Sequence, residues 1–349
     1  MNCRSACLLL IAAFLLGLPI SSPAPLVYRP GEGWTYEPVG SEGKWQKTRA
    51  KDQLEAAQAA FEARDYGQAL RSARRVVKVW PLSDFAPEAQ YLVGRCYQQK
   101  GNDEKAFKEY QKVLEKYPKT ASYQQILQRQ SEIADRYLAG KRFRLWGYIP
   151  LFRSMDKTAN MYEQIVKSGP YSEVAPQAQL KVGEARVKQR DYEAAARAYE
   201  LAADRYHDRP QIAAEALHRL GMAHFKQAQT AEYDQSAAAQ AIASFTDFMT
   251  LFPNEPRVEE TQELIRGLKT EQARGSLQTA QFYERYHKWK GALIYYNEAV
   301  LQDPTSKHAD IARERISDIK SRVEATPLAA TGVNTNQAPS KLPETPASK

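Results

Sequence analysis

The sequence has few of the residues on which covalent and metal chemistry usually depends. Only three of its 349 residues are cysteine and five are histidine. Cys3 and Cys7 lie close to the N-terminus, so Cys96 is the single cysteine in the rest of the chain. One cysteine cannot form an intramolecular disulfide, and no histidine motif accompanies Cys96. We therefore expect a packed or partly exposed thiol and not a nucleophile.

Motifs for catalysis and cofactor binding are also missing. The histidines show no i, i+4 pairing of the kind that holds zinc, and none lies in a recognisable motif with cysteine or paired carboxylates. They are His207, His218, His224, His287 and His308. The sequence contains neither a glycine-rich phosphate loop nor a nucleophile elbow. These absences predict a protein that is not an enzyme and has no cofactor and no metal site.

Long apolar runs are absent beyond the first 24 residues. The run over residues 7–20 follows Arg4 and precedes the small residues Ser22 and Ala24. It is shorter than the about 20 residues that a membrane span requires. We interpret residues 1–24 as a signal peptide that is removed near Ala24, which predicts export. No other stretch has the length and apolarity of a membrane span.

Charge of one sign is not concentrated in any segment. The chain has 49 Lys and Arg against 41 Asp and Glu, a net charge of +8. These residues are interspersed, which is typical of solvated helix faces and not of a nucleic-acid-binding patch. We expect no nucleic-acid partner, although a basic surface still suits acidic proteins or anionic lipid.

The main positive feature of the sequence is a pattern that recurs along nearly its whole length. An alanine is followed four residues on by an aromatic residue and then, about eight residues further, by proline. A unit of about 34 residues with this pattern indicates a tetratricopeptide helix-turn-helix repeat. Two antiparallel helices approach closely only where side chains are small, and proline ends the second helix. Complete examples are Ala106, Tyr110 and Pro118, with Gly94 on the preceding helix, and Ala292, Tyr296 and Pro304. The first unit has Asp65 and Tyr66 before Ala69 and keeps the spacing from alanine to Pro81. We predict an all-α, tetratricopeptide-repeat superhelical solenoid of about six helix pairs over residues 49–324.

Short connections with the pattern Pro-x-Ser join several of the units. They occur at 81–83, 170–172 and 304–306, and each is followed by an alanine pair. We expect Ser83, Ser172 and Ser306 to cap the next helix with their hydroxyl groups, and the alanine pair to pack that helix on its predecessor.

The third unit carries an insertion at 141–155 between its two helices. We expect the first helix over about 124–139 and the second from about Met155. The insertion is basic and aromatic, which exposes more apolar surface than a loop usually does. It can fold back into the groove of the solenoid, or it can act as a docking element for a partner or a lipid surface. Under the second interpretation its candidate partner-binding residues are Arg142, Trp146, Tyr148 and Phe152.

The two ends of the chain differ from the repeats. Residues 25–48 are rich in proline, glycine and aromatic residues and lack helical periodicity, so we expect an extended leader that lies against the first repeat. Residues 325–349 contain almost no large apolar side chains and should form a disordered tail.

One passage resembles the BamD/YfiO family of outer-membrane lipoproteins, a component of the β-barrel assembly machinery. Members of that family have a similar repeat ending in an aromatic residue and proline, then a long acidic helix, and a Phe-Tyr start to the last repeat. The matching residues here are Phe245, Phe248, Phe252 and Pro253, then Glu259 and Glu260, and then Phe282 and Tyr283. The similarity covers roughly residues 50–305. Two features depart from the family pattern: Cys3 precedes the apolar run and Cys7 begins it, which leaves no lipidation box, and the insertion at 141–155 has no counterpart.

The resemblance implies an exported scaffold that is an accessory factor in outer-membrane β-barrel protein assembly. Its expected partners are an Omp85/BamA-type barrel subunit or unfolded outer-membrane proteins. It implies a location in the periplasm, with peripheral association to the outer membrane as a further expectation. The alternative is a periplasmic repeat scaffold that coordinates cell-envelope and cell-division complexes.

Overall fold

The described residues of the protein are almost all helical. A computed structural model describes residues 26–31, 33–36, 46–145, 149–230 and 235–325, and these residues form thirteen helices and two short β-hairpins. The expected all-α repeat fold is therefore confirmed. The chain divides into two compact units, residues 1–227 and 228–349. The predicted signal peptide at 1–24 and residues 326–349 of the predicted tail lie outside the described residues.

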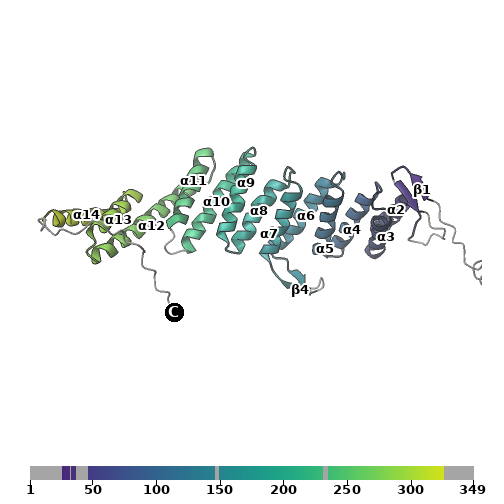
Figure 1. The fold of residues 1–349 in the computed structure, drawn as a ribbon, viewed down its shortest axis with the longest axis horizontal. Coiled ribbons are helices and arrows are strands. Elements are labelled where there is room, and N and C mark those ends of the chain that lie inside the picture. The colour runs from purple at the N-terminus through teal and green to yellow at the C-terminus, as the bar shows by residue number, and fades with distance from the viewer. Residues whose placement is uncertain (1–25, 32, 37–45, 146–148, 231–234, 326–349) are drawn as a thin grey trace, which may run out of the picture. The chain divides into compact units, whose positions relative to one another are not determined.

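In the first unit, successive helices pack on one another in chain order (Figure 1). Helix pairs α2–α3, α4–α5, α6–α7 and α8–α9 correspond to the first four predicted repeats. The helices are α2 (Ala50–Glu62), α3 (Tyr66–Val79), α4 (Ala86–Gln99), α5 (Asp103–Lys116), α6 (Tyr123–Leu138), α7 (Met155–Ser168), α8 (Ala175–Lys188), α9 (Tyr192–Arg205) and α10 (Pro210–Thr230). The two helices of the third repeat begin within one or two residues of the expected positions.

An Asp or Asn side chain caps the second helix of the first, second and fourth repeats. The side chain of Asp65 accepts a hydrogen bond of 2.9 Å from the backbone N–H three residues further on. The same contact measures 3.3 Å at Asn102 and 3.1 Å at Asp191. Each cap satisfies a backbone donor that has no partner within the helix. The turn between the paired helices is thus encoded locally in every one of these repeats.

A left-handed residue precedes each of these caps. Gly101 has a φ of 68°, and the equivalent positions Arg64 and Arg190 have φ values of 60° and 64°. Only glycine adopts this conformation without a steric penalty. The two arginines therefore store local backbone strain that Gly101 avoids.

Small residues bring the paired helices into close contact, as the repeat pattern predicts. A Cβ atom added to Gly94 would lie 2.4 Å from a ring carbon of Tyr110, and one added to Gly183 would lie 2.4 Å from Tyr199. Ala106 and Tyr110 are both fully buried. Each tyrosine ring thus occupies space that a side chain at the facing glycine would otherwise fill.

The prediction that all three connection serines cap the next helix was wrong for two of them. The hydroxyl groups of Ser83 and Ser172 donate backwards, to the carbonyl groups of Trp80 and Gly169. Their helices begin three residues later, at Ala86 and Ala175, with proline at the second position. Ser306 directly precedes its helix, and its oxygen accepts from the Ala309 N–H at 3.2 Å. The Ser306 hydroxyl also donates backwards, to the Asp303 carbonyl at 2.9 Å, so the distance from the serine to the first helical residue decides only whether the serine caps that helix as well.

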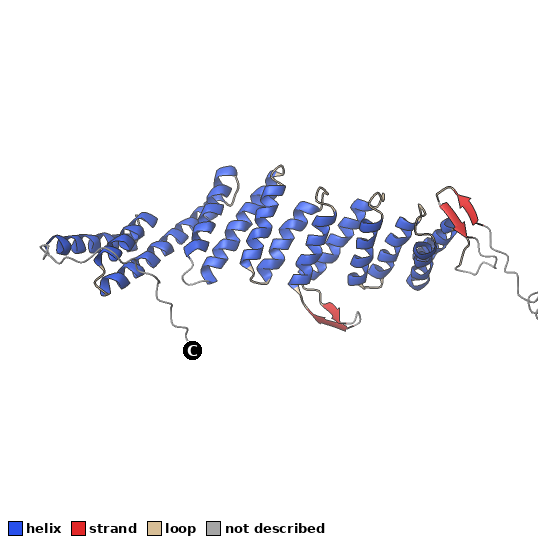
Figure 2. Ribbon diagram, viewed as in Figure 1, coloured by secondary structure: helices blue, strands red, loops and turns tan. Residues whose placement is uncertain are grey.

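Two antiparallel hairpins accompany the helices of this unit (Figure 2). They are β1 (Leu26–Arg29) with β2 (Gly33–Tyr36), and β3 (Phe143–Leu145) with β4 (Ile149–Phe152). The first hairpin lies in the predicted leader, and the carbonyl of Gly31 in its turn accepts a hydrogen bond of 2.7 Å from the Asp84 N–H. This bond joins the leader to the connection that follows the first repeat.

The described residues 235–325 of the second unit form four helices with their own core. They are α11 (Gln235–Leu251), α12 (Val258–Arg285), α13 (Trp289–Gln302) and α14 (Lys307–Ala325). Helix α13 packs on both α12 and α14 around the fully buried ring of Tyr296. Its hydroxyl donates to Glu284, which also forms an ion pair with Arg315 of α14. This network fixes the last helix against the last predicted repeat.

Candidate protein-binding surfaces

The base of the hairpin at 143–152 packs against the helices beside it. The ring of Phe143 is buried and stacks on Tyr137 at 4.2 Å between centroids. It also stacks on Phe152 at 6.2 Å, and the Lys157 ammonium lies over both phenylalanine rings, at 5.2 and 4.7 Å from their centroids. The Arg144 N–H donates to Glu104 of α5 at 2.7 Å. The insertion is therefore anchored at its base to its own repeat and to the one before it.

The predicted docking residues lie at different places in this hairpin. Arg142 is exposed at the start of β3, and Phe152 keeps 36% of its surface exposed at the end of β4. Trp146 and Tyr148 lie outside the described residues. The role of these four side chains in binding a partner stays a prediction.

Groups that could support catalysis are scarce in the described part of the chain. Among those residues, no set of three or more His, Cys, Asp or Glu side chains is placed to hold a metal ion. Cys96 is fully buried, and this burial raises the pKa of its thiol to about 11. A neutral thiol is a poor nucleophile at physiological pH, as the sequence led us to expect.

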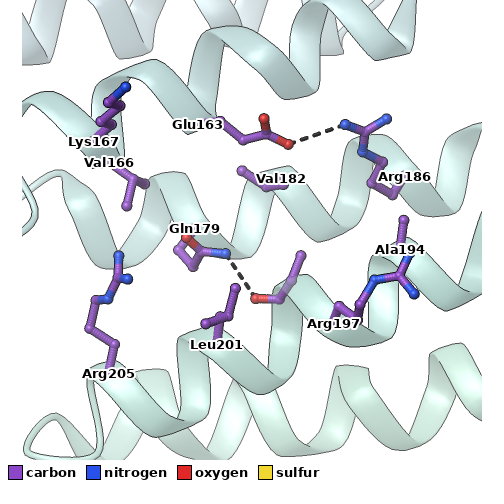
Figure 3. Close-up of a pocket in the computed structure, with 11 residues that line it drawn as sticks. Glu163, Val166, Lys167, Gln179, Val182, Arg186, Ala194, Arg197, Leu201 and Arg205 are labelled. Carbon is purple, nitrogen blue, oxygen red and sulfur yellow. Dashed lines mark hydrogen bonds and ion pairs between the residues drawn. The ribbon is translucent and has the colours of Figure 1, made fainter.

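A groove that sequence reasoning missed lies over helix α8, between α7 and α9 (Figure 3). Its volume is about 560 Å³. Val182 and Gln179 of α8 form its floor, and Val166 of α7 and Leu201 of α9 line its sides. Val166 and Val182 are almost fully buried, whereas Leu201 leaves 50% of its surface exposed. The amide of Gln179 donates to the Ala198 carbonyl at 3.0 Å, so the polar floor residue is satisfied within the fold.

Four cationic side chains and one carboxylate surround this apolar centre. Figure 3 shows Lys167 and Arg205 at one end of the groove and Arg186 and Arg197 at the other. Arg186 bridges Glu163 at 3.1 Å and Asp156 at 2.9 Å.

The cations differ in how far the fold already neutralises them. Burial lowers the pKa of Arg186, but its two carboxylate partners more than offset this and raise the pKa above its ordinary value. Among the described side chains, Arg197 forms an ion pair with Glu193 alone, one turn before it on an exposed face. Within the described ranges, no carboxylate lies within ion-pair distance of Lys167 or Arg205. The groove therefore carries an excess of positive charge that the fold leaves without a counter-ion.

One part of this arrangement is visible in the sequence. Arg197, Leu201 and Arg205 follow one another at i, i+4 and i+8, which places them on one face of a helix. The contributions of Lys167 and Arg186 cannot be read in this way, because they come from two other helices.

The second unit has an exposed apolar surface of its own on α12 and α13. Phe282 lies in the last turn of α12 and Tyr286 directly follows that helix; their ring centroids are 4.8 Å apart, and they are 54% and 60% exposed. On α13, Ile294 and Leu301 are 65% and 79% exposed. Exposed apolar side chains in such number are typical of a protein-binding surface.

Comparison with protein families identifies two parts of the chain. A family model described as outer membrane lipoprotein, YfiO, matches residues 153–316, from the end of the hairpin through most of α14. A tetratricopeptide-repeat model matches residues 54–121, the first two repeats. The chain is a YfiO-like tetratricopeptide-repeat protein. The groove and the exposed surface of the second unit both lie inside the YfiO-like segment.

The chain is also similar to several solved structures, at low identity and low TM-score. The C-terminal part of a tetratricopeptide-repeat protein from Cytophaga hutchinsonii is 14% identical, covers 76% of this chain and 87% of its own, and gives a TM-score of 0.34. MamA from Desulfovibrio magneticus is 16% identical, with 59% and 97% covered and a TM-score of 0.31. PilW, a type IV pilus biogenesis factor, is 15% identical, with 75% and 97% covered and a TM-score of 0.26. Comparison with curated protein sequences finds no match.

The two matched families are families of non-catalytic scaffolds whose members bind other proteins. The match to a family of outer membrane lipoproteins supports a location in the cell envelope. In the part of the chain that the structure describes, no helix combines the length and apolarity needed to cross a membrane.

Proposed function

We propose that this YfiO-like protein is an exported scaffold in outer-membrane β-barrel protein assembly. In this role it binds a barrel subunit of the Omp85/BamA type or an unfolded outer-membrane client. It works in the periplasm, peripheral to the outer membrane. The observation that carries the proposal is the YfiO match over residues 153–316, which continues across α7 to α14 and includes the passage that resembles the family in sequence.

The surfaces within the matched segment are consistent with binding and not with chemistry. Side chains such as Phe282, Tyr286 and Leu301 are exposed although they are large and apolar. A stack of helix pairs presents such side chains along an extended face, so affinity accumulates from many modest contacts. Loss of the protein should therefore impair the transfer of a client between partners.

Affinity purification from detergent-solubilised envelopes tests the proposal. A tagged copy of the full chain should recover an Omp85-type barrel protein, and Phe282→Ser with Tyr286→Ser should reduce that recovery. The control is Tyr171→Ser, because Tyr171 is 93% exposed but lies in the first unit, outside the exposed apolar surface of the second unit. Recovery of peptidoglycan synthases without any barrel protein would instead support the alternative, a scaffold for cell-envelope and cell-division complexes.

A further inference from the structure

We infer that the groove over α8 is a binding site for an acidic, amphipathic segment of a protein partner. The inference rests on the proposed function, because it specifies one of the contacts that such a scaffold makes. It is carried by charge complementarity around an apolar centre, and each step uses side chains that the structure describes.

The first step concerns the charge that is available to a ligand. Arg186 is held by two carboxylates of the fold, at 2.9 and 3.1 Å, and is 18% exposed, so it contributes little to a new contact. Lys167 and Arg205 lie at the same end of the groove and have no carboxylate partner among the described side chains. Arg197 has one exposed partner, Glu193, which a stronger ligand can replace because such surface pairs contribute little.

The second step concerns spacing. Arg197 and Arg205 are eight residues apart on α9, which separates them by about 12 Å along the helix at 1.5 Å per residue. Leu201 lies midway between them and is half-exposed over the floor of the groove. A ligand that uses all three needs two negative groups about two helical turns apart, with an apolar side chain between them. An amphipathic helix with glutamates at i and i+7 and leucine at i+3 or i+4 meets this requirement.

The third step concerns why the groove suits an acidic protein segment better than a nucleic acid. A nucleic acid requires a track of cations along a continuous phosphate backbone. Here the carboxylate of Glu163 lies beside Arg186 and that of Glu193 lies beside Arg197, and both would repel such a backbone. The apolar strip of Val166, Val182 and Leu201 also offers nothing to a phosphate chain, whereas it complements the apolar face of a helix. The groove thus favours a ligand with separated carboxylates.

The test uses a labelled peptide with a helix-forming alanine and glutamine background, two glutamates seven positions apart and a leucine midway. Fluorescence anisotropy with the full chain should show saturable binding that weakens as salt is raised. Arg197→Glu with Arg205→Glu should weaken binding by about tenfold or more. The matched control is Arg71→Glu with Lys78→Glu, which reverses two exposed cations seven residues apart on α3.

Two further peptides separate specific recognition from simple charge attraction. Replacing both glutamates by glutamine should abolish binding, and replacing the leucine by serine should weaken it severalfold. Three results would overturn the inference: no binding of the first peptide by the wild-type chain, unchanged affinity in the Arg197→Glu, Arg205→Glu variant, or equal affinity for the serine peptide. Circular dichroism of both charge-reversal variants should match that of the wild type, because the four substituted side chains are exposed.

Complementation distinguishes failure of this inference from failure of the proposed function. Cells depleted of the protein receive either the wild-type gene or the Arg197→Glu, Arg205→Glu variant, and folded outer-membrane barrels are measured. Reduced barrel folding with the variant supports the groove as a site of assembly contacts. Full rescue by the variant would contradict the groove inference, while the defect of the depleted cells would leave the proposed function standing.

Discussion

Substitution of Gly94 by alanine tests whether the helix seams set the stability of the repeats. The added Cβ atom would lie 2.4 and 2.5 Å from two ring carbons of Tyr110. Ordinary carbon contacts are about 3.5–4.0 Å, so the ring must move by about 1 Å. Tyr110 is fully buried, and its hydroxyl donates to Gln98 at 2.7 Å, so it has little room to move.

The expected magnitude follows from two opposing terms. Overpacking of a core costs about 1–3 kcal/mol, whereas alanine in a helix interior gains about 1 kcal/mol over glycine. Because the overlap is with a fully buried ring, we place the overpacking cost in the upper part of that range, at about 2–3 kcal/mol. Gly94→Ala should therefore lower the free energy of unfolding by about 1–2 kcal/mol. Urea denaturation followed by circular dichroism should show a lower midpoint at an unchanged slope.

A matched control substitution should change the free energy of unfolding in the opposite direction. A Cβ atom added to Gly267 on α12 meets no atom within 4 Å, and this residue is exposed. Gly267→Ala should therefore raise stability by about 0.5–1 kcal/mol. A double-mutant cycle gives a second check, because Gly94→Ala should cost little once Tyr110 is replaced by leucine. Equal or greater stability of Gly94→Ala in the wild-type background would refute the close packing of α4 on α5.

Three other predictions address the turns, the thiol and the insertion. Arg190→Gly removes an arginine in the left-handed conformation, with a φ of 64°, and should stabilise the chain by about 1 kcal/mol in the same urea assay. A lower denaturation midpoint would show that the contacts of the Arg190 side chain stabilise the chain by more than its backbone strain costs. Cys96, whose pKa is raised to about 11, should resist alkylation at pH 8 until the chain unfolds, and rapid labelling of the native protein would contradict its burial. Because the thiol ionises at a lower pH in the unfolded chain, the contribution of Cys96 to the free energy of unfolding should decrease as pH rises above about 9. If the insertion is a docking element, Trp146→Ala with Phe152→Ala should weaken partner recovery while helicity stays unchanged, and a loss of helicity without a separate binding defect would favour the fold-back interpretation.

The elements that the sequence predicts well are those specified by neighbouring residues. The cap at Asp65 and the alanine–tyrosine spacing at Ala106 and Tyr110 each lie within one or two helical turns. Local contacts of this kind leave a periodic pattern, so the repeats could be placed before the structure was known.

The helix caps were predicted wrongly at two of the three serines because the Pro-x-Ser pattern does not specify how far the serine lies from the next helix. Ser83 and Ser306 share the same Pro-x-Ser pattern, but only Ser306 directly precedes a helix. The sequence also contains an indication of the hairpin at 143–152, since apolar residues flank Gly147 in a run without helical periodicity. That its base would stack on Tyr137 could not be predicted, because this contact depends on how α6 ends.

The groove was not predictable, because it depends on side chains from three helices. Lys167 and Arg205 lie 38 positions apart in the numbering, and only the packing of α7, α8 and α9 brings them to one end of the same surface. Single-helix periodicity identifies the Arg197, Leu201 and Arg205 face. It cannot show which neighbouring helices leave that face open.

The most direct test of the central claim is barrel folding during depletion of the protein. Folded outer-membrane barrels migrate differently from heated ones in denaturing gels, so heat-modifiability reports the folded fraction. The account predicts that this fraction falls for several barrel proteins, and that periplasmic stress rises, before any other envelope defect appears. Normal barrel folding together with a septation defect would contradict the account and support the cell-division alternative.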